Sequence, residues 1–341
     1  MSEKPKKRPD RGPEMDAFLA RTGRGSATRR MLAGDASFRR YERVDHENRI
    51  MVLMDAPPPW EDVGPFIAVT QLLENAGVSV PKILDADEAE GFLLLEDLGD
   101  GILTRVLKNE PSRERELYTA ACEALLALQH GSVRGHLPAY DEAVYLREVA
   151  LFAEWFLPQI VGIEKAKLLR EEWLNLWRDV VRAVPLQQAV LVHRDYHADN
   201  LLWLHDREGH RAIGMLDYQD ALWGDAAYDL VSLLEDARRD VAPATVKACY
   251  DAFAATQGAD FGLRYAVLGA QRNAKIIGIF TRLCVRDGKA HYLEYMPRVW
   301  GHFLHDLENP ALAAVKKFVD AHVPGQWRGA FSADLTMGGI A

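Results

Sequence analysis

The sequence LVHRDYHADN occupies residues 191–200, and the apolar residues LLW follow it at once. A second apolar run, IGML at residues 213–216, leads directly into Asp217, seventeen residues beyond Asn200. Both apolar runs have the length and composition of short β-strands. Asp195, Asn200 and Asp217 therefore flank a predicted strand–turn–strand unit, which would bring their side chains together.

These three residue types suit phosphoryl transfer. The transferred group is highly charged in its transition state, so positioning and charge neutralisation provide most of the catalysis. A carboxylate beside the attacking hydroxyl can orient it and accept its proton, and we assign this catalytic role to Asp195. Magnesium prefers hard oxygen ligands, which the amide of Asn200 and the carboxylate of Asp217 would supply. We therefore expect phosphoryl-transfer chemistry that uses Mg²⁺.

Each residue taken alone also has a simpler explanation. An Asp near an Asn is usually part of a turn or a cap, and an isolated H-R-D triplet is weak evidence. His193 is more typical of a packed loop residue than of a catalyst, and His197 could face the substrate or stabilise the loop. We expect Asp229 to accept hydrogen bonds from the catalytic loop rather than to act as a base. The functional interpretation depends on the joint pattern and its order.

Composition limits the other classes of function. The 341 residues carry a net charge of −9, which argues against a general nucleic-acid-binding protein. No uncharged apolar run reaches the roughly 18 residues of a membrane-spanning helix. Cys122, Cys249 and Cys284 are odd in number and widely spaced, which predicts reduced, buried cysteines. We expect a soluble cytoplasmic protein, a monomer or weak homodimer without nucleic-acid or membrane partners.

The chain divides into a tail and two lobes. Residues 1–13 are basic and proline-containing, and we predict a disordered tail. Residues 14–98 are predicted to form a small lobe with strands over 37–44, 50–54, 82–84 and 92–95 and a helix ending near residue 75. After a predicted hinge at 99–101, residues 99–341 are predicted to form a helical lobe with helices over 112–130, 141–156, 165–184 and 261–282. The predicted fold class is α+β, with a small antiparallel-sheet lobe and a large helical lobe.

The motifs in the second lobe point to a known superfamily. H-x-D-x-x-x-x-N at 193–200, a strand ending in Asp217 and G-x-x-x-Y-D at 224–229 resemble the aminoglycoside phosphotransferases and choline kinases. The stretches at 33–41, 94–100, 216–221 and 271–283 are similar to a bacterial family of cell-wall-recycling kinases. That family phosphorylates the anomeric (C1) hydroxyl of N-acetylmuramate and N-acetylglucosamine. The resemblance implies a protein-kinase-like two-lobed fold, ATP and Mg²⁺ as cofactors and a small amino-sugar substrate.

The resemblance also implies nucleotide-binding residues. The predicted loop over the phosphates comprises Gly34, Asp35, Ala36, Ser37 and Phe38. Small residues there would let backbone N–H groups approach phosphate oxygens, although an ordinary hairpin explains the stretch equally well. Glu96, Asp97 and Leu98 would form the hinge whose backbone binds adenine.

One feature of the superfamily is missing from this sequence. Members usually carry a phosphate-binding Lys on the third strand, and residues 50–54 contain none. Arg40 shares a strand face with Phe38 and Val44, so we favour Arg40 over Arg39 as its replacement. The helical partner of the missing Lys would be Glu74.

The substrate end is predicted from the resemblance and from one helix. The candidate substrate-binding residues are His197, Asp220, Glu235, Arg272 and Lys275. Gln271, Lys275, Gly278 and Arg282 recur on one line of the helix over 261–282, which suggests a cationic groove wall suited to the lactyl carboxylate of N-acetylmuramate. A solvated helix edge or an internal salt bridge explains each residue as well.

Two other functions remain open from sequence. A choline or aminoglycoside kinase must hold a cation and therefore needs an acidic or aromatic cage, which Glu235 and Asp236 could help to form. A catalytically inactive binding module is supported by the absent third-strand Lys alone. The joint presence of Asp195, Asn200 and Asp217 argues against it.

Overall fold

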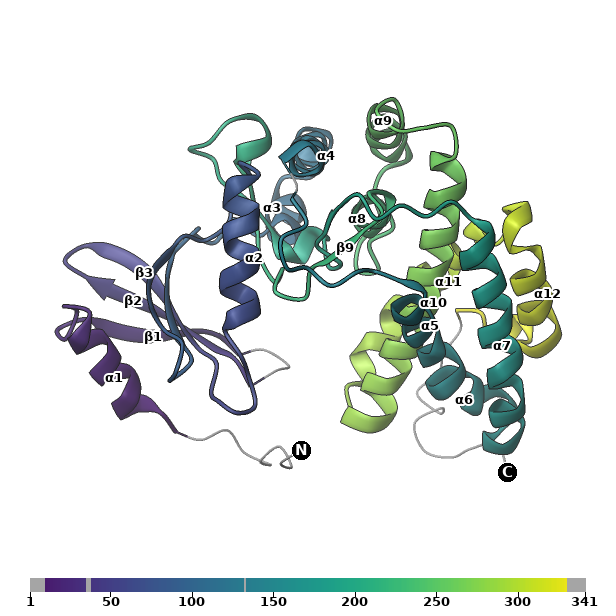
Figure 1. The fold of residues 1–341 in the computed structure, drawn as a ribbon, viewed down its shortest axis with the longest axis horizontal. Coiled ribbons are helices and arrows are strands. Elements are labelled where there is room, and N and C mark those ends of the chain that lie inside the picture. Colours follow the sequence, from purple (N-terminus) through teal and green to yellow (C-terminus); the bar gives the residue numbers. More distant parts are fainter. Residues whose placement is uncertain (1–9, 35–37, 132, 330–341) are drawn as a thin grey trace.

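The N-terminal part of the chain forms one antiparallel sheet of five strands in the order β1-β2-β3-β5-β4 (Figure 1). The computed structural model describes residues 10–34, 38–131 and 133–329. The strands are β1 (Thr28–Gly34), β2 (Arg40–His46), β3 (Arg49–Asp55), β4 (Ile83–Asp87) and β5 (Phe92–Glu96). Four of them overlap the predicted strands, β3 and β5 almost completely and β2 and β4 in part. β1 is absent from the prediction because it begins with two arginines and has only three consecutive apolar residues.

A helix covers each face of this sheet. α1 (Gly12–Arg21) buries Met15, Phe18 and Leu19 against one face, and α2 (Gly64–Asn75) packs against the other. Because strand side chains alternate between faces, both sides of the sheet are buried. The predicted tail is too long, since α1 begins inside it and Arg11 is buried in an ion pair with Asp55 at 2.6 Å. Residues 1–9 lie outside the described residues.

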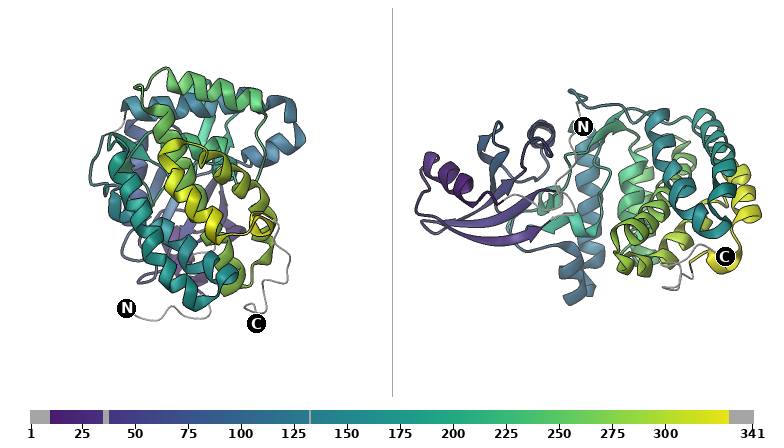
Figure 2. Two further views of the ribbon diagram at one scale, coloured as in Figure 1. Left: turned by 90° about the vertical axis from the view of Figure 1, so that its right-hand side faces the viewer. Right: turned by 90° about the horizontal axis from the view of Figure 1, so that it is seen from below.

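The rest of the described chain is mainly helical, which confirms the predicted fold class (Figures 1 and 2). The helices are α3 (Leu103–Asn109), α4 (Glu114–Gly131), α5 (Glu142–Leu151), α6 (Leu157–Val161), α7 (Ile163–Ala183), α8 (Ala227–Leu234), α9 (Pro243–Ala254), α10 (Phe261–Asp287), α11 (Met296–Asp306) and α12 (Ala313–His322). Two small antiparallel pairs join β6 (Val190–Val192) to β9 (Leu222–Gly224) and β7 (Leu201–Trp203) to β8 (Ile213–Met215). The β7–β8 pair is the predicted strand–turn–strand unit.

The predicted helix over 141–156 is interrupted by helix packing. α5 ends at Leu151, and residues 152–156 form a π-helical turn. Gly278 of α10 approaches this point so closely that a Cβ there would lie 2.3 Å from the carbonyl carbon of Leu151. Gly278 is therefore a contact between helices, not part of a groove wall.

Close backbone contacts join the sheet lobe to the helical lobe. The N–H of Met215 donates to the carbonyl of Ser79 at 2.9 Å, and the N–H of Trp203 donates to the carbonyl of Gly101 at 2.7 Å. A Cβ at Gly101 would lie 2.5 Å from the carbonyl oxygen of Trp203. The connection between the lobes at residues 99–101 therefore requires glycine at this position.

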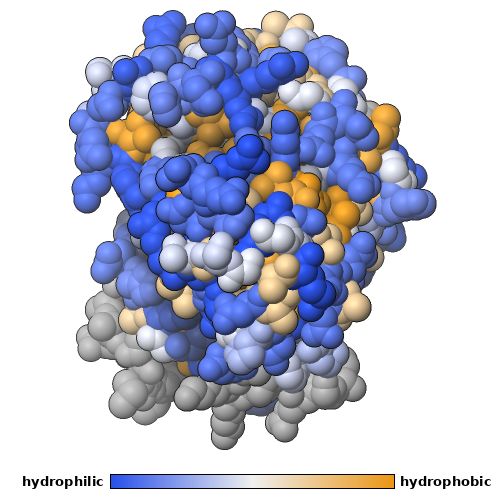
Figure 3. Space-filling view, turned by 90° about the vertical axis from the view of Figure 1, so that its left-hand side faces the viewer, coloured by the Kyte–Doolittle hydropathy of each residue, from blue (hydrophilic) through white to orange (hydrophobic). Residues whose placement is uncertain are grey.

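The cysteines are as the sequence predicts, and no membrane-spanning helix is found in the described residues. The three cysteines are buried and free of disulfides. Within the described ranges, no helix is both long enough and apolar enough to cross a membrane. Figure 3 shows that the sheet-side face is mostly hydrophilic, with apolar side chains gathered in a few hollows.

Candidate active site

The β7–β8 pair brings the predicted metal ligands to one wall of a cavity. Leu201 lies opposite Met215, and the N–H of Leu216 donates to the carbonyl of Asn200 at 2.9 Å. Asn200 and Asp217 therefore flank neighbouring strand ends. Both line a cavity of about 420 Å³, whose other walls come from the sheet, α2 and the hinge.

Hydrogen bonds fix the predicted catalytic loop, residues 193–200, around Asp195. The side-chain Nδ2 of Asn200 donates to the carbonyl of Asp195 at 3.0 Å, which leaves the amide oxygen of Asn200 for another partner. The buried carboxylate of Asp229 accepts hydrogen bonds from the N–H groups of His193 at 2.6 Å and Arg194 at 2.9 Å. Arg194 has φ = +76°, a left-handed conformation that these hydrogen bonds help to hold.

Nearby positive charge keeps Asp195 ionised. Burial alone would raise the pKa of the Asp195 carboxyl, but the positively charged groups around it, with Lys275 of α10 first, lower this pKa below its ordinary value. Lys275 is itself buried, and its ammonium keeps a raised pKa despite burial because Glu148 lies beside it. Asp195 is therefore a carboxylate at neutral pH, as a proton acceptor must be.

Glu148 of α5 joins residues of three separate segments next to the predicted catalytic loop. It was not among the site residues predicted from the sequence. Its buried carboxylate contacts Arg194 at 2.5 Å, Lys275 at 3.2 Å and the hydroxyl of Tyr140 at 2.5 Å. Burial would raise the pKa of Glu148, but Lys275 and Arg194 lower it to about 2. A signal was present in the sequence, since Glu148 lies between Tyr145 and Val149 on the apolar face of a helix.

The two histidines of the loop occupy different surroundings. His193 is fully buried and stands edge-on to Tyr196 and Tyr218, and burial lowers its pKa. His197 is 6% exposed, and its Nε2 lies 3.3 Å from Nη1 of Arg238 and 3.5 Å from Nδ2 of Asn200. Burial and then the charge of Arg238 hold the pKa of His197 well below its ordinary value, so its imidazole is neutral.

Only part of the predicted phosphate loop can be placed. Gly34 ends β1, whereas Asp35, Ala36 and Ser37 lie outside the described residues. The N–H of Phe38 donates to the carboxylate of Glu61 at 3.0 Å.

The choice of Arg40 for the phosphates is wrong. Arg40 contacts Glu42 at 3.0 Å and Met15 of α1, so it lies on the sheet face that α1 covers. Arg39 instead forms a 3.4 Å ion pair with Glu61, ahead of α2. Glu74 is exposed on α2 and lines a different cavity, so it is not a partner in the active site.

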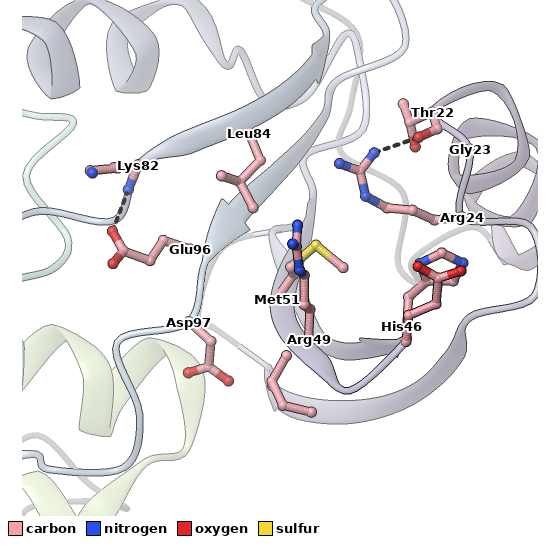
Figure 4. A pocket seen from close by; sticks show the side chains of 12 residues that line it. Thr22, Gly23, Arg24, His46, Arg49, Met51, Lys82, Leu84, Glu96 and Asp97 are labelled. Carbon is pink, nitrogen blue, oxygen red and sulfur yellow. Dashed lines mark hydrogen bonds between the residues drawn. The ribbon is translucent and has the colours of Figure 1, made fainter.

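The predicted adenine-binding residues 96–98 lie between two cavities. Glu96 and Asp97 line the cavity beside Asn200 and also a larger one of about 640 Å³ on the outer side of the sheet (Figure 4). Their side chains form ion pairs, Glu96 with Arg207 at 2.8 Å and Asp97 with Arg43 at 2.6 Å. Within the described ranges, no residue hydrogen-bonds to the backbone of Leu98, which leaves its N–H and carbonyl available.

The residues predicted to bind substrate do not form one surface. Asp220 is exposed, and Lys275 is paired with Glu148. Glu235 is buried and accepts from Asn273 at 2.8 Å, and its carbonyl lies 3.4 Å from Nη1 of the buried Arg272. The expected groove wall on α10 is therefore wrong, because the polar line is packed against α5 and α8.

Known proteins are similar to this chain in sequence and in fold. Residues 28–266 match the model of the "Phosphotransferase enzyme family". Similar curated relatives include two N-acetylmuramate/N-acetylglucosamine kinases. The Caulobacter vibrioides protein is 35% identical, with 92% of this chain and 96% of the relative covered. The Pseudomonas aeruginosa protein is 42% identical, with 78% and 80% covered.

Solved structures show the same fold at low sequence identity. A choline/ethanolamine kinase family protein from Mesorhizobium loti has a TM-score of 0.59 at 16% identity, over 91% of this chain and 99% of that one. A spectinomycin phosphotransferase in complex with ADP and spectinomycin has a TM-score of 0.56 at 12% identity, over 93% and 100%. At these identities the likeness concerns the fold alone.

Proposed function

Because the chain belongs to the phosphotransferase enzyme family, we propose that it transfers the γ-phosphoryl group of ATP to the anomeric hydroxyl of N-acetylmuramate and of N-acetylglucosamine. The observation that supports this proposal is that Asn200 and Asp217 line one cavity between residues 96–98 and the helical lobe, while the side chain of Asn200 donates to the backbone carbonyl of Asp195. The acceptor sugars come from the names of relatives that are similar over most of the chain.

Asp195 acts on the acceptor hydroxyl in this proposal. Its carboxylate orients the anomeric hydroxyl toward the γ-phosphorus and takes up the hydroxyl proton as the new O–P bond forms. The bond between the γ-phosphorus and the bridging oxygen breaks, and ADP leaves with that electron pair. The lowered pKa of Asp195 keeps it in the carboxylate form, which both orients the hydroxyl and can accept its proton.

Asn200 and Asp217 would hold Mg²⁺. The fit is chemical: the amide nitrogen of Asn200 is already bonded to the loop, which leaves its oxygen, and Asp217 contributes a carboxylate beside it. Magnesium usually takes few protein ligands and completes its shell with water and phosphate oxygens. When bound, the ion would neutralise charge on the nucleotide phosphates.

The cavity and the hinge would hold the nucleotide. Val52 and Leu95 of the sheet and Leu202 of β7 give the cavity apolar walls for a base. The free backbone groups of Leu98 would pair with the adenine edge.

A kinase for choline or aminoglycosides fits the helical lobe less well. Such an acceptor is a cation and needs an acidic or aromatic cage. Glu235 is buried against Asn273, and Asp236 is committed to the N–H groups of Ala198 and Arg238. Neither carboxylate is available for a cage.

The acceptor is tested by phosphorus NMR after incubation of the protein with ATP, Mg²⁺ and one acceptor at a time. We expect an anomeric phosphate from N-acetylmuramate and from N-acetylglucosamine, and none from choline or kanamycin. The methyl glycoside of N-acetylglucosamine, whose anomeric oxygen is blocked, is the matched control and should give no product. A product from choline or kanamycin alone, or from the methyl glycoside, would refute the proposal.

A further inference from the structure

We propose that Arg238, in the segment after α8, binds the carboxylate of N-acetylmuramate. This inference rests on the proposed function. The two sugars differ in charge, because N-acetylmuramate carries a lactyl carboxylate on C3 and N-acetylglucosamine is neutral. A cation beside the acceptor site would contact the carboxylate of N-acetylmuramate and would have no such partner in N-acetylglucosamine.

The other cations near Asp195 are already occupied. Lys275 and Arg194 share the carboxylate of Glu148, at 3.2 Å and 2.5 Å, and Lys275 also donates to the hydroxyl of Tyr228 at 3.1 Å. Arg272 is 3% exposed and donates to a backbone carbonyl. A sugar carboxylate would have to displace internal partners to reach any of these three cations.

Arg238 differs from them in exposure and in its partners. Its side chain is 27% exposed, and its Nε contacts Asp199 at 3.1 Å. Asp199 is itself half-exposed and also accepts from the hydroxyl of Thr104 at 2.5 Å, so it screens Arg238 only partly. Nη1 of Arg238 faces His197, and within residues 10–34, 38–131 and 133–329 no partner hydrogen-bonds to Nη2. One edge of the guanidinium is therefore free for a carboxylate.

A single carboxylate fixes Arg238 relative to the catalytic loop. The buried Asp236 accepts from the N–H of Arg238 at 2.8 Å and from the N–H of Ala198 at 3.2 Å. Arg238 thus stands beside His197, which in turn lies against Asn200. C1 and C3 of the sugar are both bonded to C2, so a sugar whose C1 hydroxyl faces Asp195 carries its C3 lactyl group nearby. Arg238 contacts the loop of Asp195 through His197 and through Asp236, which places its guanidinium beside that loop.

His197 orients Arg238. The buried His197 lies with its Nε2 3.3 Å from Nη1 of the guanidinium, which donates to it. This contact fixes one side of the guanidinium and leaves Nη2 without a partner among the described residues.

The test compares three acceptors with the full-length enzyme: N-acetylmuramate, its methyl ester and N-acetylglucosamine. Arg238→Gln should lower kcat/KM for N-acetylmuramate by about 10- to 100-fold, mainly through KM, because a hydrogen bond to a charged group is lost. The ester and N-acetylglucosamine, which have no carboxylate, should change little. Arg238→Lys should recover part of the loss, because it keeps the charge without the planar fork.

Arg239→Gln is the matched control. Arg239 is the next residue, but it pairs with Glu114 at 2.7 Å and with the hydroxyl of Tyr118 at 2.8 Å on α4. This variant should leave the ratio of kcat/KM values among the three acceptors unchanged. An equal loss for all three acceptors in Arg238→Gln would overturn the inference. Absence of turnover with both sugars in the unmodified enzyme would instead refute the proposed function itself.

Discussion

Asp195→Asn is expected to lower kcat by about 10²- to 10⁴-fold, the usual contribution of a positioned general base. The amide keeps the size of the carboxylate but cannot accept the hydroxyl proton. Nucleotide affinity should stay close to normal, because the loop is held by the backbone contacts of Asp229 and by Asn200, which bonds to the carbonyl of Asp195. Steady-state kinetics and calorimetric titration with ADP and Mg²⁺ measure the two quantities.

The control for this variant is Asp206→Asn. Asp206 is an exposed carboxylate in the turn between β7 and β8, near the same loop in sequence. It should show normal kcat. Near-normal turnover in Asp195→Asn would remove Asp195 from its assigned role.

Glu148→Gln is expected to lower the free energy of unfolding by about 3–5 kcal/mol, the cost of breaking a buried ion pair on one side. The change leaves the buried Lys275 and the adjacent Arg194 without their shared carboxylate. It should also reduce kcat, because Arg194 belongs to the catalytic loop. Urea unfolding followed by circular dichroism measures the stability.

The difference in free energy of unfolding between the natural protein and Glu148→Gln should decrease as the pH is lowered. The pKa of Glu148 is about 2 in the folded protein, below its ordinary value of 4.5, so its charge stabilises the fold above pH 4.5. That contribution is lost as the pH falls toward 2. The gap between the natural protein and Glu148→Gln should therefore shrink over this range. Glu142→Gln at the partly exposed start of α5 is the control, and an equal pH dependence of the two variants would contradict the role assigned to Glu148.

Local spacing made the centre of the site predictable from sequence. Asn200 follows Asp195 by five residues in one loop, and two apolar runs then predict the strands that place Asp217 beside it. These relations lie within 23 residues of sequence, so no knowledge of distant packing was needed.

The residues that were misassigned depend on contacts between distant segments. Arg40 was correctly placed on an inward face of β2, but the face is covered by α1, a helix that the sequence pattern did not predict. Lys275 and Glu148 come from α10 and α5, which are joined only by tertiary packing. The polar residues on α10 predicted a groove wall because the spacing of residues within one helix does not show which other helix packs against it. In the structure α5 packs there.

The most direct test of the account is a crystal structure with Mn²⁺ in place of Mg²⁺ and a non-hydrolysable ATP analogue, using the anomalous signal of the manganese. We predict a manganese peak bonded to the side-chain oxygens of Asn200 and Asp217, with the γ-phosphate facing the carboxylate of Asp195. Manganese bound elsewhere, or a γ-phosphate out of reach of Asp195, would contradict the claim that these three residues form the phosphoryl-transfer site.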